Sequence, residues 1–281
     1  MSTATAPQIT DRRNAPKGRK KGKLGALARA EWLQFRRNKV IMFLAILLPL
    51  GVPALVLSSL LFNDAEPSVT GGATTTELYL MMGLVLVLFY SALSMVTTRR
   101  DEGVLKRLRT GEAKDWQILA AIGVPGTLIV VALFFVLVVA MVIMGVPMPE
   151  NPVAMLIALV GGVMCTMFFA LITSGFTKNA EAAQLTSMPV LLLGMLSASS
   201  FRELLPEAVR VFAEKNPFGV AYDLIYLGWA GNFPAKVMAE AGSLDTGELW
   251  TAIAKLTAIL VIWILVLAWC ASEYMRWDTH R

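Results

Sequence analysis

Few residues in this 281-residue chain could carry out chemistry. Ser197, Ser199 and Ser200 have hydroxyls that could attack a carbonyl, but nucleophilic catalysis needs a neighbouring base and none accompanies them in sequence. The single histidine, His280, lies in the C-terminal tail. Serines in apolar helices more often form hydrogen bonds to neighbouring helices. We therefore predict no catalytic residue and no enzymatic activity for the chain itself.

Motifs that bind metals or nucleotides are missing from the sequence as well. It contains no HExxH, GxSxG or GxxxxGK[ST] pattern. Cys165 and Cys270 lie in apolar runs, where a thiol behaves as a small hydrophobe. We predict no metal and no cofactor in this chain, which has no phosphate loop with which it could bind ATP by itself.

A charged segment at 99–109 is the strongest candidate for contact with a partner. It reads Arg-Arg-Asp-Glu-Gly-Val-Leu-Lys-Arg-Leu-Arg. In a short helix, Leu105 and Leu108 share one face because they are three residues apart, while the basic side chains point elsewhere. Such an apolar ridge suits a groove on a partner protein, and it equally suits the inner leaflet, where basic residues accumulate.

The elements that position this segment are apolar runs long enough to span a membrane. Hydrophobic residues make up 56% of the chain and charged residues 16%, and the mean hydropathy is +0.63, which leaves too little polar surface for a soluble globule. A helix of about 20 apolar residues crosses the hydrocarbon layer. We predict an all-α membrane protein with six spans, at about 40–62, 78–98, 117–146, 152–177, 183–201 and 250–272.

The positions of Lys and Arg predict the orientation of these spans. Residues 1–39 carry eleven, the loop 99–115 six, the loop 178–181 one and the tail after Ser272 two, against five on the opposite side. This split of 20 to 5 alternates as six spans require. We therefore predict a multi-pass protein of the cytoplasmic membrane with both termini in the cytoplasm.

The chain outside the spans has three segments of distinct composition. Residues 1–23 are basic and poor in large apolar groups, which predicts a disordered cytoplasmic tail drawn to anionic lipids, with nucleic-acid binding as the disfavoured alternative. Residues 273–281 form the second cytoplasmic tail. In residues 24–39 the apolar side chains recur at helical spacing, which predicts an amphipathic helix on the inner membrane surface. Its apolar residues are Leu24, Leu27, Ala28, Trp32 and Phe35.

The longest connection on the opposite side, residues 202–250, is only partly polar. Its stretch from Phe218 to Trp229 is apolar and aromatic but too short to cross a bilayer. Two structures fit this pattern: a re-entrant helix pair that caps the outer mouth, and a helix that lies on the surface.

Two segments resemble motifs of the type-2 ABC transporter permeases. The segment 99–109 looks like the Arg/Glu-Glu-Gly-x-Leu-x-x-Leu signature of that family, although many relatives continue with Thr-Pro where this chain has Thr110-Gly111-Glu112-Ala113-Lys114. Residues 216–223 are similar to its Asn-Pro-x-x-x-x-x-Asp segment before the last span. The resemblance implies ATPase-coupling roles for Glu102, Gly103, Leu105, Lys106, Arg107, Leu108 and Arg109, and a re-entrant segment that contains Asn216, Pro217, Tyr222 and Asp223.

The resemblance also implies partners and a substrate path. It implies a separate ATP-binding cassette ATPase that holds ATP and Mg, and a second permease copy, identical or similar, with the substrate path between the two copies. In the family the second and fifth spans line this path, and here they carry the candidates Phe89, Tyr90, Met95, Met188 and Met195. We expect export of an apolar or amphipathic cargo, as in multidrug efflux. We also expect the chain to contact membrane lipids and not to bind nucleic acid.

Two other functions are weighed beside the exporter. A membrane scaffold or immunity protein would use the same cytoplasmic loop to hold a partner and would transport nothing. An ion-coupled carrier would need ionisable side chains inside its spans, and the predicted spans contain almost none; Lys255 lies near an outer end.

Overall fold

The computed structural model describes residues 23–37, 39–62, 66–110, 114–179, 181–275 and 277, and within these residues it is helical and contains no strand. The predicted tail 1–23 therefore lies outside the described residues except for Lys23, and so does most of 273–281. The elements are α1 (Lys23–Arg37), α2 (Lys39–Phe62), α3 (Val69–Met82), η2 (Gly83–Phe89), α4 (Tyr90–Asp101), α5 (Val104–Arg109), α6 (Asp115–Ile143), α7 (Pro152–Phe176), α8 (Ala182–Leu196), α9 (Ser199–Arg202), α10 (Glu207–Lys215), α11 (Pro217–Ala230), α12 (Pro234–Met238) and α13 (Thr246–Tyr274).

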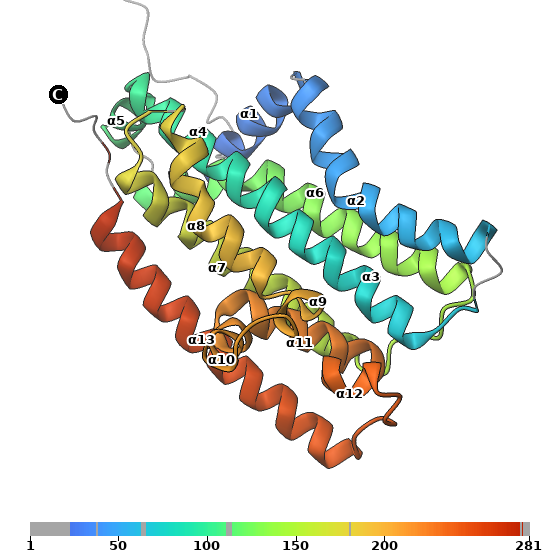
Figure 1. Cartoon of the computed structure of the whole chain (residues 1–281). Coiled ribbons are helices and arrows are strands. Elements are labelled where there is room, and N and C mark those ends of the chain that lie inside the picture. The colour runs from blue at the N-terminus through green and yellow to red at the C-terminus, as the bar shows by residue number, and fades with distance from the viewer. Residues whose placement is uncertain are drawn as a thin grey trace, which may run out of the picture.

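Four helices of the described chain are long and apolar enough to cross a membrane: Val69–Asp101, which joins α3, η2 and α4, then Asp115–Ile143, Pro152–Phe176 and Thr246–Tyr274. α8 is a shorter apolar helix of 15 residues. In Figure 1, α1, α5 and the C-terminal end of α13 lie at one end of the bundle, and α12 lies at the opposite end.

The helix of the predicted second span begins at Val69, nine residues before the expected start at 78. Ser68 caps its first turn by accepting a hydrogen bond from the Gly71 amide. The Thr-rich segment that follows looked like a loop in the sequence, but its hydroxyls bind α11: Trp229 Nε1 donates to Thr76 Oγ1 over 2.8 Å. Polar residues are therefore buried inside a helix here because α11 supplies their partners.

The middle of the same helix is a π-helical stretch, η2, which runs from Gly83 to Phe89. Its hydrogen bonds join residues five apart rather than four, so it is wider than the α-helical turns of α3 and α4 on either side.

The predicted fifth span at 183–201 is interrupted. α8 ends at Leu196, and Ala198 adopts an extended conformation (φ −68°, ψ 143°) before the short helix α9 begins at Ser199. The break is stabilised by the Glu77 carboxylate, which accepts a hydrogen bond from the Ser199 amide over 2.6 Å. The helix thus ends at a contact with Glu77, which is more than a hundred residues away in sequence, and no local sequence pattern predicts this end.

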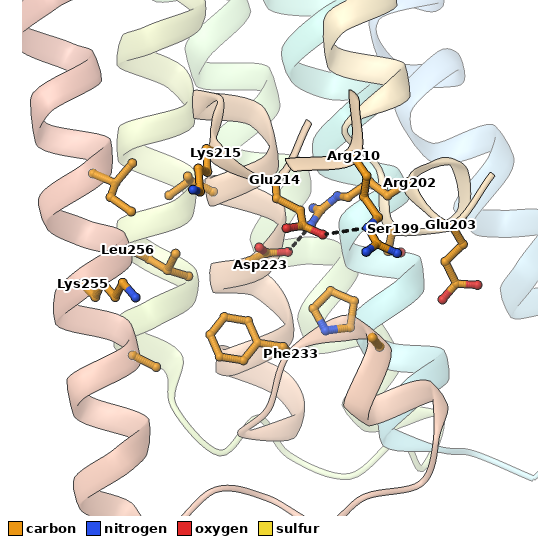
Figure 2. Close-up of a pocket in the computed structure, with 15 residues that line it drawn as sticks. Ser199, Arg202, Glu203, Arg210, Glu214, Lys215, Asp223, Phe233, Lys255 and Leu256 are labelled. Carbon is orange, nitrogen blue, oxygen red and sulfur yellow. Dashed lines mark hydrogen bonds and ion pairs between the residues drawn. The ribbon is translucent and has the colours of Figure 1, made fainter. Parts of the chain in front are cut away.

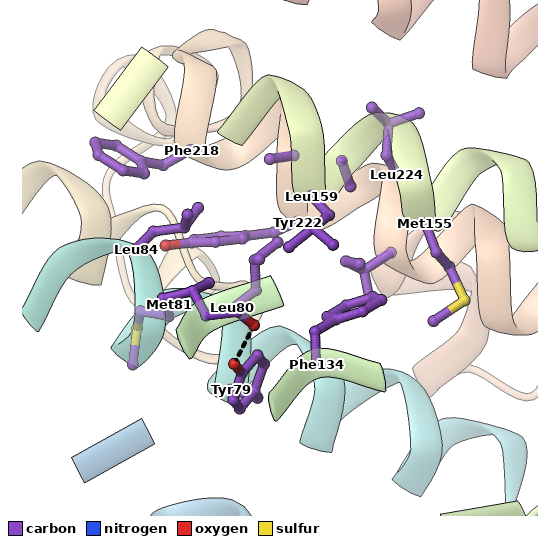
Figure 3. Close-up of a cluster of buried hydrophobic side chains, with 14 of the residues drawn as sticks. Tyr79, Leu80, Met81, Leu84, Phe134, Met155, Leu159, Phe218, Tyr222 and Leu224 are labelled. Atoms are coloured by element: carbon purple, nitrogen blue, oxygen red, sulfur yellow. Dashed lines mark hydrogen bonds between the residues drawn. The ribbon is translucent and has the colours of Figure 1, made fainter. Parts of the chain in front are cut away.

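The core of the bundle is built around α11, which packs against α7, α3 and α13. Every residue from Pro217 to Trp229 is buried, so this segment is not a helix on the protein surface. Figure 3 shows Tyr222 and Phe218 of α11 beside side chains of α3, α6 and α7, with the Tyr79 hydroxyl donating to the Val130 carbonyl over 2.5 Å. The rings of Phe218 and Phe169 stack with centroids 5.6 Å apart.

Candidate functional site

The residues that the sequence analysis assigned to ATPase coupling lie where α4, α5 and the start of α6 meet; we call residues 99–109 the α4–α5 junction. The two arginines that open it make different contacts. Arg99 forms an ion pair and a hydrogen bond with Glu31 of α1. Glu31 is only 3% exposed, and burial raises the pKa of its carboxyl, with the Arg99 charge opposing that rise. The pair fastens α1 to the end of α4.

Arg100 points to the opposite side and binds the C-terminal end of α7. Its Nη1 donates to the Ser174 carbonyl over 2.6 Å, and its Nη2 donates to the carbonyls of Thr177 and Lys178. The last carbonyls of a helix lack partners within the helix and carry the negative end of its dipole, so a buried guanidinium fits them well. Arg100 therefore connects the α4–α5 junction to α7.

A tight turn separates α4 from α5. Gly103 has φ +67°, in the left-handed region that glycine adopts without strain. Arg107 reaches back over the turn, and its Nη2 donates to the Glu102 carbonyl over 3.0 Å. These contacts fix the angle at which α5 leaves α4.

The apolar ridge predicted for α5 does not face outward. Leu105 is fully buried, and together with Val96, Ile118, Ile122, Leu171 and Ala271 it forms a small core that we call the Leu105 cluster. Leu108 is partly buried against the same cluster. The prediction was wrong on this point because the crevice between α4, α6 and α7 already offers these leucines an apolar site. The outward surface of the α4–α5 junction is charged: Glu102 of the turn and Lys106, Arg107 and Arg109 of α5 are exposed.

The N-terminal helix α1 covers the same end of the bundle. It packs mainly against α6. Leu27 contacts the Leu105 cluster, Trp32 contacts the main core and Ala28 is half-buried. The side chains of Leu24 and Phe35 lie outside the described residues. At least part of the apolar face of α1 therefore rests on the bundle.

The five candidates for a substrate path fall into two groups. Tyr90, Met188 and Met195 are 37%, 51% and 39% exposed, and they lie on α4 and α8, which contact each other. Phe89 is fully buried in the main core, and Met95 is partly buried against the Leu105 cluster. The structure thus brings three of the five to the surface and leaves two in the interior.

A buried carboxylate that the sequence analysis did not select lies inside α3. Glu77 is fully buried and accepts hydrogen bonds from the Ser199 amide (2.6 Å), the Ser199 hydroxyl (2.5 Å) and the Tyr226 hydroxyl (3.2 Å). The expectation that the spans contain almost no ionisable side chain was therefore incomplete, because α3 starts early enough to include Glu77. Both carboxylate oxygens are used to hold α9 and α11 in place.

The predicted re-entrant residues organise the turn between α10 and α11. Asn216 caps α11 by accepting from the amides of Phe218 and Gly219, and Pro217 occupies the first turn. Tyr222 donates to the Gly194 carbonyl over 3.2 Å. Asp223 pairs with Arg202 of α9, with Nη1 and Oδ1 2.6 Å apart and both side chains buried. Sequence reasoning missed Arg202, although a lone Asp in an apolar helix signals that a cation must lie nearby.

The family model described as ABC-2 type transporter matches residues 22–227, about three quarters of the chain. The chain matches none of the curated proteins significantly. Because the match extends from α1 through the α4–α5 junction to α11, the chain belongs to the ABC-2 type transporter family of membrane transport components.

Proposed function

We propose that this chain is the permease subunit of an ATP-driven exporter and that it works with a separate ATP-binding subunit to move an apolar or amphipathic cargo. The observation that carries the proposal is the α4–α5 junction. Its exposed charged surface lies on a short helix that is tied to α1 through Glu31–Arg99 and to α7 through Arg100. A push on this helix would therefore be passed to two other helices.

The charged surface of α5 is the proposed docking site for the ATP-binding subunit, since the leucines face inward. ATP and Mg would be held by that subunit. Glu102 and Arg107 lie on the outward side, where charges of both signs favour a polar groove over a purely apolar one.

We also propose that the chain crosses the membrane six times, by α2, the α3–η2–α4 helix, α6, α7, α8 and α13, with both termini in the cytoplasm. α2 and α8 supplement the four long apolar helices. The 20-to-5 division of Lys and Arg supports this orientation.

Contacts of α13 support a re-entrant placement of α10 and α11. Trp250 and Trp269 are exposed and lie about 28 Å apart along the helix, close to the ~30 Å between two aromatic belts. Trp263, about 20 Å from Trp250 along the axis, donates from Nε1 to the Lys215 carbonyl over 2.8 Å. The end of α10 then lies deep in the bilayer, and α11 returns to the outer surface, where Gly228 accepts from the Asn151 amide.

The exposed residues Tyr90, Met188 and Met195 are proposed to face a second permease copy across the substrate path. An apolar surface formed by two neighbouring helices needs either lipid or another helix against it. The methionines suit a variable cargo because their side chains are flexible and polarisable.

The decisive experiment is affinity purification of the tagged chain in mild detergent, with mass spectrometry of the bound proteins and an ATPase assay. We expect a stoichiometric partner with a phosphate-binding loop, and ATP turnover that changes when the two proteins are combined. A chain that purifies without such a partner, under conditions that preserve other transporter complexes, would refute the proposal.

A further inference from the structure

A cavity of about 640 Å³ lies between α9, α10, α11, α12 and α13, and no residue of α4, α5 or α8 lines it. Figure 2 shows its lining, with Lys215 of α10 and Lys255 of α13 on one side and Glu203 on the other. This part of the chain includes residues beyond 227, where the family match ends.

The charges around the cavity do not all neutralise one another. Arg202 is paired with Asp223, and the Arg210 guanidinium lies 3.8 Å from the Glu214 carboxylate. Lys215 and Lys255, in contrast, form no ion pair with any residue that the structure describes. Two positive charges therefore remain at the end of the cavity formed by α10 and α13, while the carboxylate of Glu203, which also forms no ion pair with a described residue, lies on the opposite side.

The wall between these lysines is apolar. Ile259 lies on the same face of α13 as Lys255, since it follows it by four residues, and the neighbouring Leu256 also lines the cavity. Phe233 faces them from the segment before α12. The cavity thus combines a basic end with a hydrocarbon surface, which is the complement of an amphiphile with an anionic head.

The depth of the two lysines strengthens this match. Lys255 lies five residues, about 7 Å, inward of Trp250 along α13. Lys215 lies deeper still, because its carbonyl accepts a hydrogen bond from Trp263, which is about 20 Å inward of Trp250 along α13. Ammonium groups at such depth are costly unless they reach the headgroup region or meet an anion.

We propose that this cavity binds an amphiphile through its anionic group, with Lys215 and Lys255 as the cationic contacts and the Leu256 side of α13 beside its apolar body. The anionic group is a phosphate, sulfonate or carboxylate, carried by a membrane lipid or by a soluble amphiphile. The proposal rests on the membrane placement of α13 but not on ATP-driven export, so binding is measured on the purified chain without any ATPase.

The test is native mass spectrometry of the full chain in neutral detergent, titrated with phosphatidylglycerol, phosphatidylcholine or taurocholate. We expect phosphatidylglycerol, taurocholate or both to bind at least about tenfold more tightly than phosphatidylcholine. In the double variant Lys215→Gln/Lys255→Gln this preference should fall to about twofold or less. Preference for phosphatidylglycerol alone identifies a membrane lipid as the source of the anion, and preference for taurocholate alone identifies a soluble amphiphile.

Matched variants separate a specific site from general basicity or misfolding. Lys236→Gln removes an exposed lysine of α12 that does not line the cavity, and it should keep the full preference. The double variant Lys215→Arg/Lys255→Arg keeps both charges and should keep the preference for the anionic amphiphile over phosphatidylcholine. The proposal is overturned if neither anion is preferred, if the preference survives in the double Gln variant, or if Lys236→Gln loses it equally. Should the double Gln variant not fold, Lys255→Gln alone is compared with Lys255→Arg, and equal preference for the anion in these two variants overturns the proposal.

Discussion

Arg100, the second-last residue of α4, donates a hydrogen bond to the carbonyl of Ser174 near the end of α7, over 2.6 Å and with only 4% of the arginine exposed. The two residues are 74 positions apart. Through this bond the end of α7 and the start of the α4–α5 junction move as one body, because a buried guanidinium that loses its acceptors pays a large desolvation cost.

Replacement of Arg100 by Ala should therefore destabilise the chain by about 2–4 kcal/mol, since the carbonyls of α7 lose their buried partner. Arg100→Lys should recover only part of this loss, because an ammonium cannot reproduce the fork of donors that reaches several carbonyls. Thermal unfolding in detergent measures the effect.

The control for Arg100 is Arg109→Ala. Arg109 lies 3.4 Å from Asp115 with both side chains about half exposed, so its pair should contribute less than about 1 kcal/mol. Equal losses in the two variants would contradict the role of Arg100 as a cap of α7.

The pair Glu31–Arg99 should show strong coupling in a double-mutant cycle. Arg99→Met leaves the Glu31 carboxylate buried without its partner, so it should destabilise the chain more than Arg99→Met combined with Glu31→Gln. We expect a coupling of about 1–3 kcal/mol. Additive effects would show that α1 is not held by this pair.

The pH dependence of these variants follows from the same burial. The folded-state pKa of Glu31 lies above its ordinary value, so the folded chain binds this proton more tightly than the unfolded chain does. The stability that this group contributes therefore falls as the pH rises from the ordinary pKa of a glutamate through the higher pKa of the folded state. Without Arg99 the pKa rises further, and the melting temperature of Arg99→Met should increase between about pH 7 and about pH 5 relative to the variant that also carries Glu31→Gln.

The turn at Gly103 should resist any residue with a Cβ atom. Its space is open, with no atom within 4 Å of an added Cβ, so the cost of Gly103→Ala comes from φ +67° alone and should be about 1 kcal/mol. Gly103→Asn should cost less because Asn tolerates this conformation. Gly25→Ala in α1 is the opposite control: it has the same open space but helical geometry, and it should stabilise the chain.

Substitutions in the α4–α5 junction should have different effects at buried and at exposed positions. Leu105→Asp places a charge in the Leu105 cluster and should cost several kcal/mol, visible as poor folding. Glu102→Lys changes an exposed side chain and should leave thermal stability within about 0.5 kcal/mol, while it weakens retention of the ATPase during purification. If Leu105→Asp folds normally and Glu102→Lys retains its partner fully, the proposed docking surface is wrong.

The length of the apolar runs predicted the helices whose surroundings are uniformly apolar. The long apolar runs that became α6, α7 and α13 differ from their predicted bounds by only a few residues, because hydrophobic length and caps such as Asn151 with Pro152 are local signals. The early start of α3 and the break at Ala198 had no such signal. Both depend on Glu77, Ser199 and α11, which meet only in the folded chain.

In the candidate site, too, the features with a local sequence signal were predictable and those that depend on distant contacts were not. The sequence singled out the segment 99–109 by its dense charge cluster after an apolar run, and its role in ATPase coupling stays a prediction. It could not reveal that Leu105 faces inward or that Arg99 and Arg100 bind different helices, because spacing on a six-residue helix does not say which side meets the rest of the protein. The lone Asp223 in an apolar segment was the available clue to a buried cation, and it was not used to search for Arg202.

The π-helical stretch η2 sets the angular phase between the two ends of the Val69–Asp101 helix. Each π-type bond spans one residue more than an α-type bond, so conversion of one such turn to α-helical form would rotate everything beyond it by roughly 100°. Arg99 and Arg100 lie ten and eleven residues past Phe89 and would turn with it. A screw-like rotation of this helix about its own axis is therefore the movement to which the two arginines at its end would respond most directly.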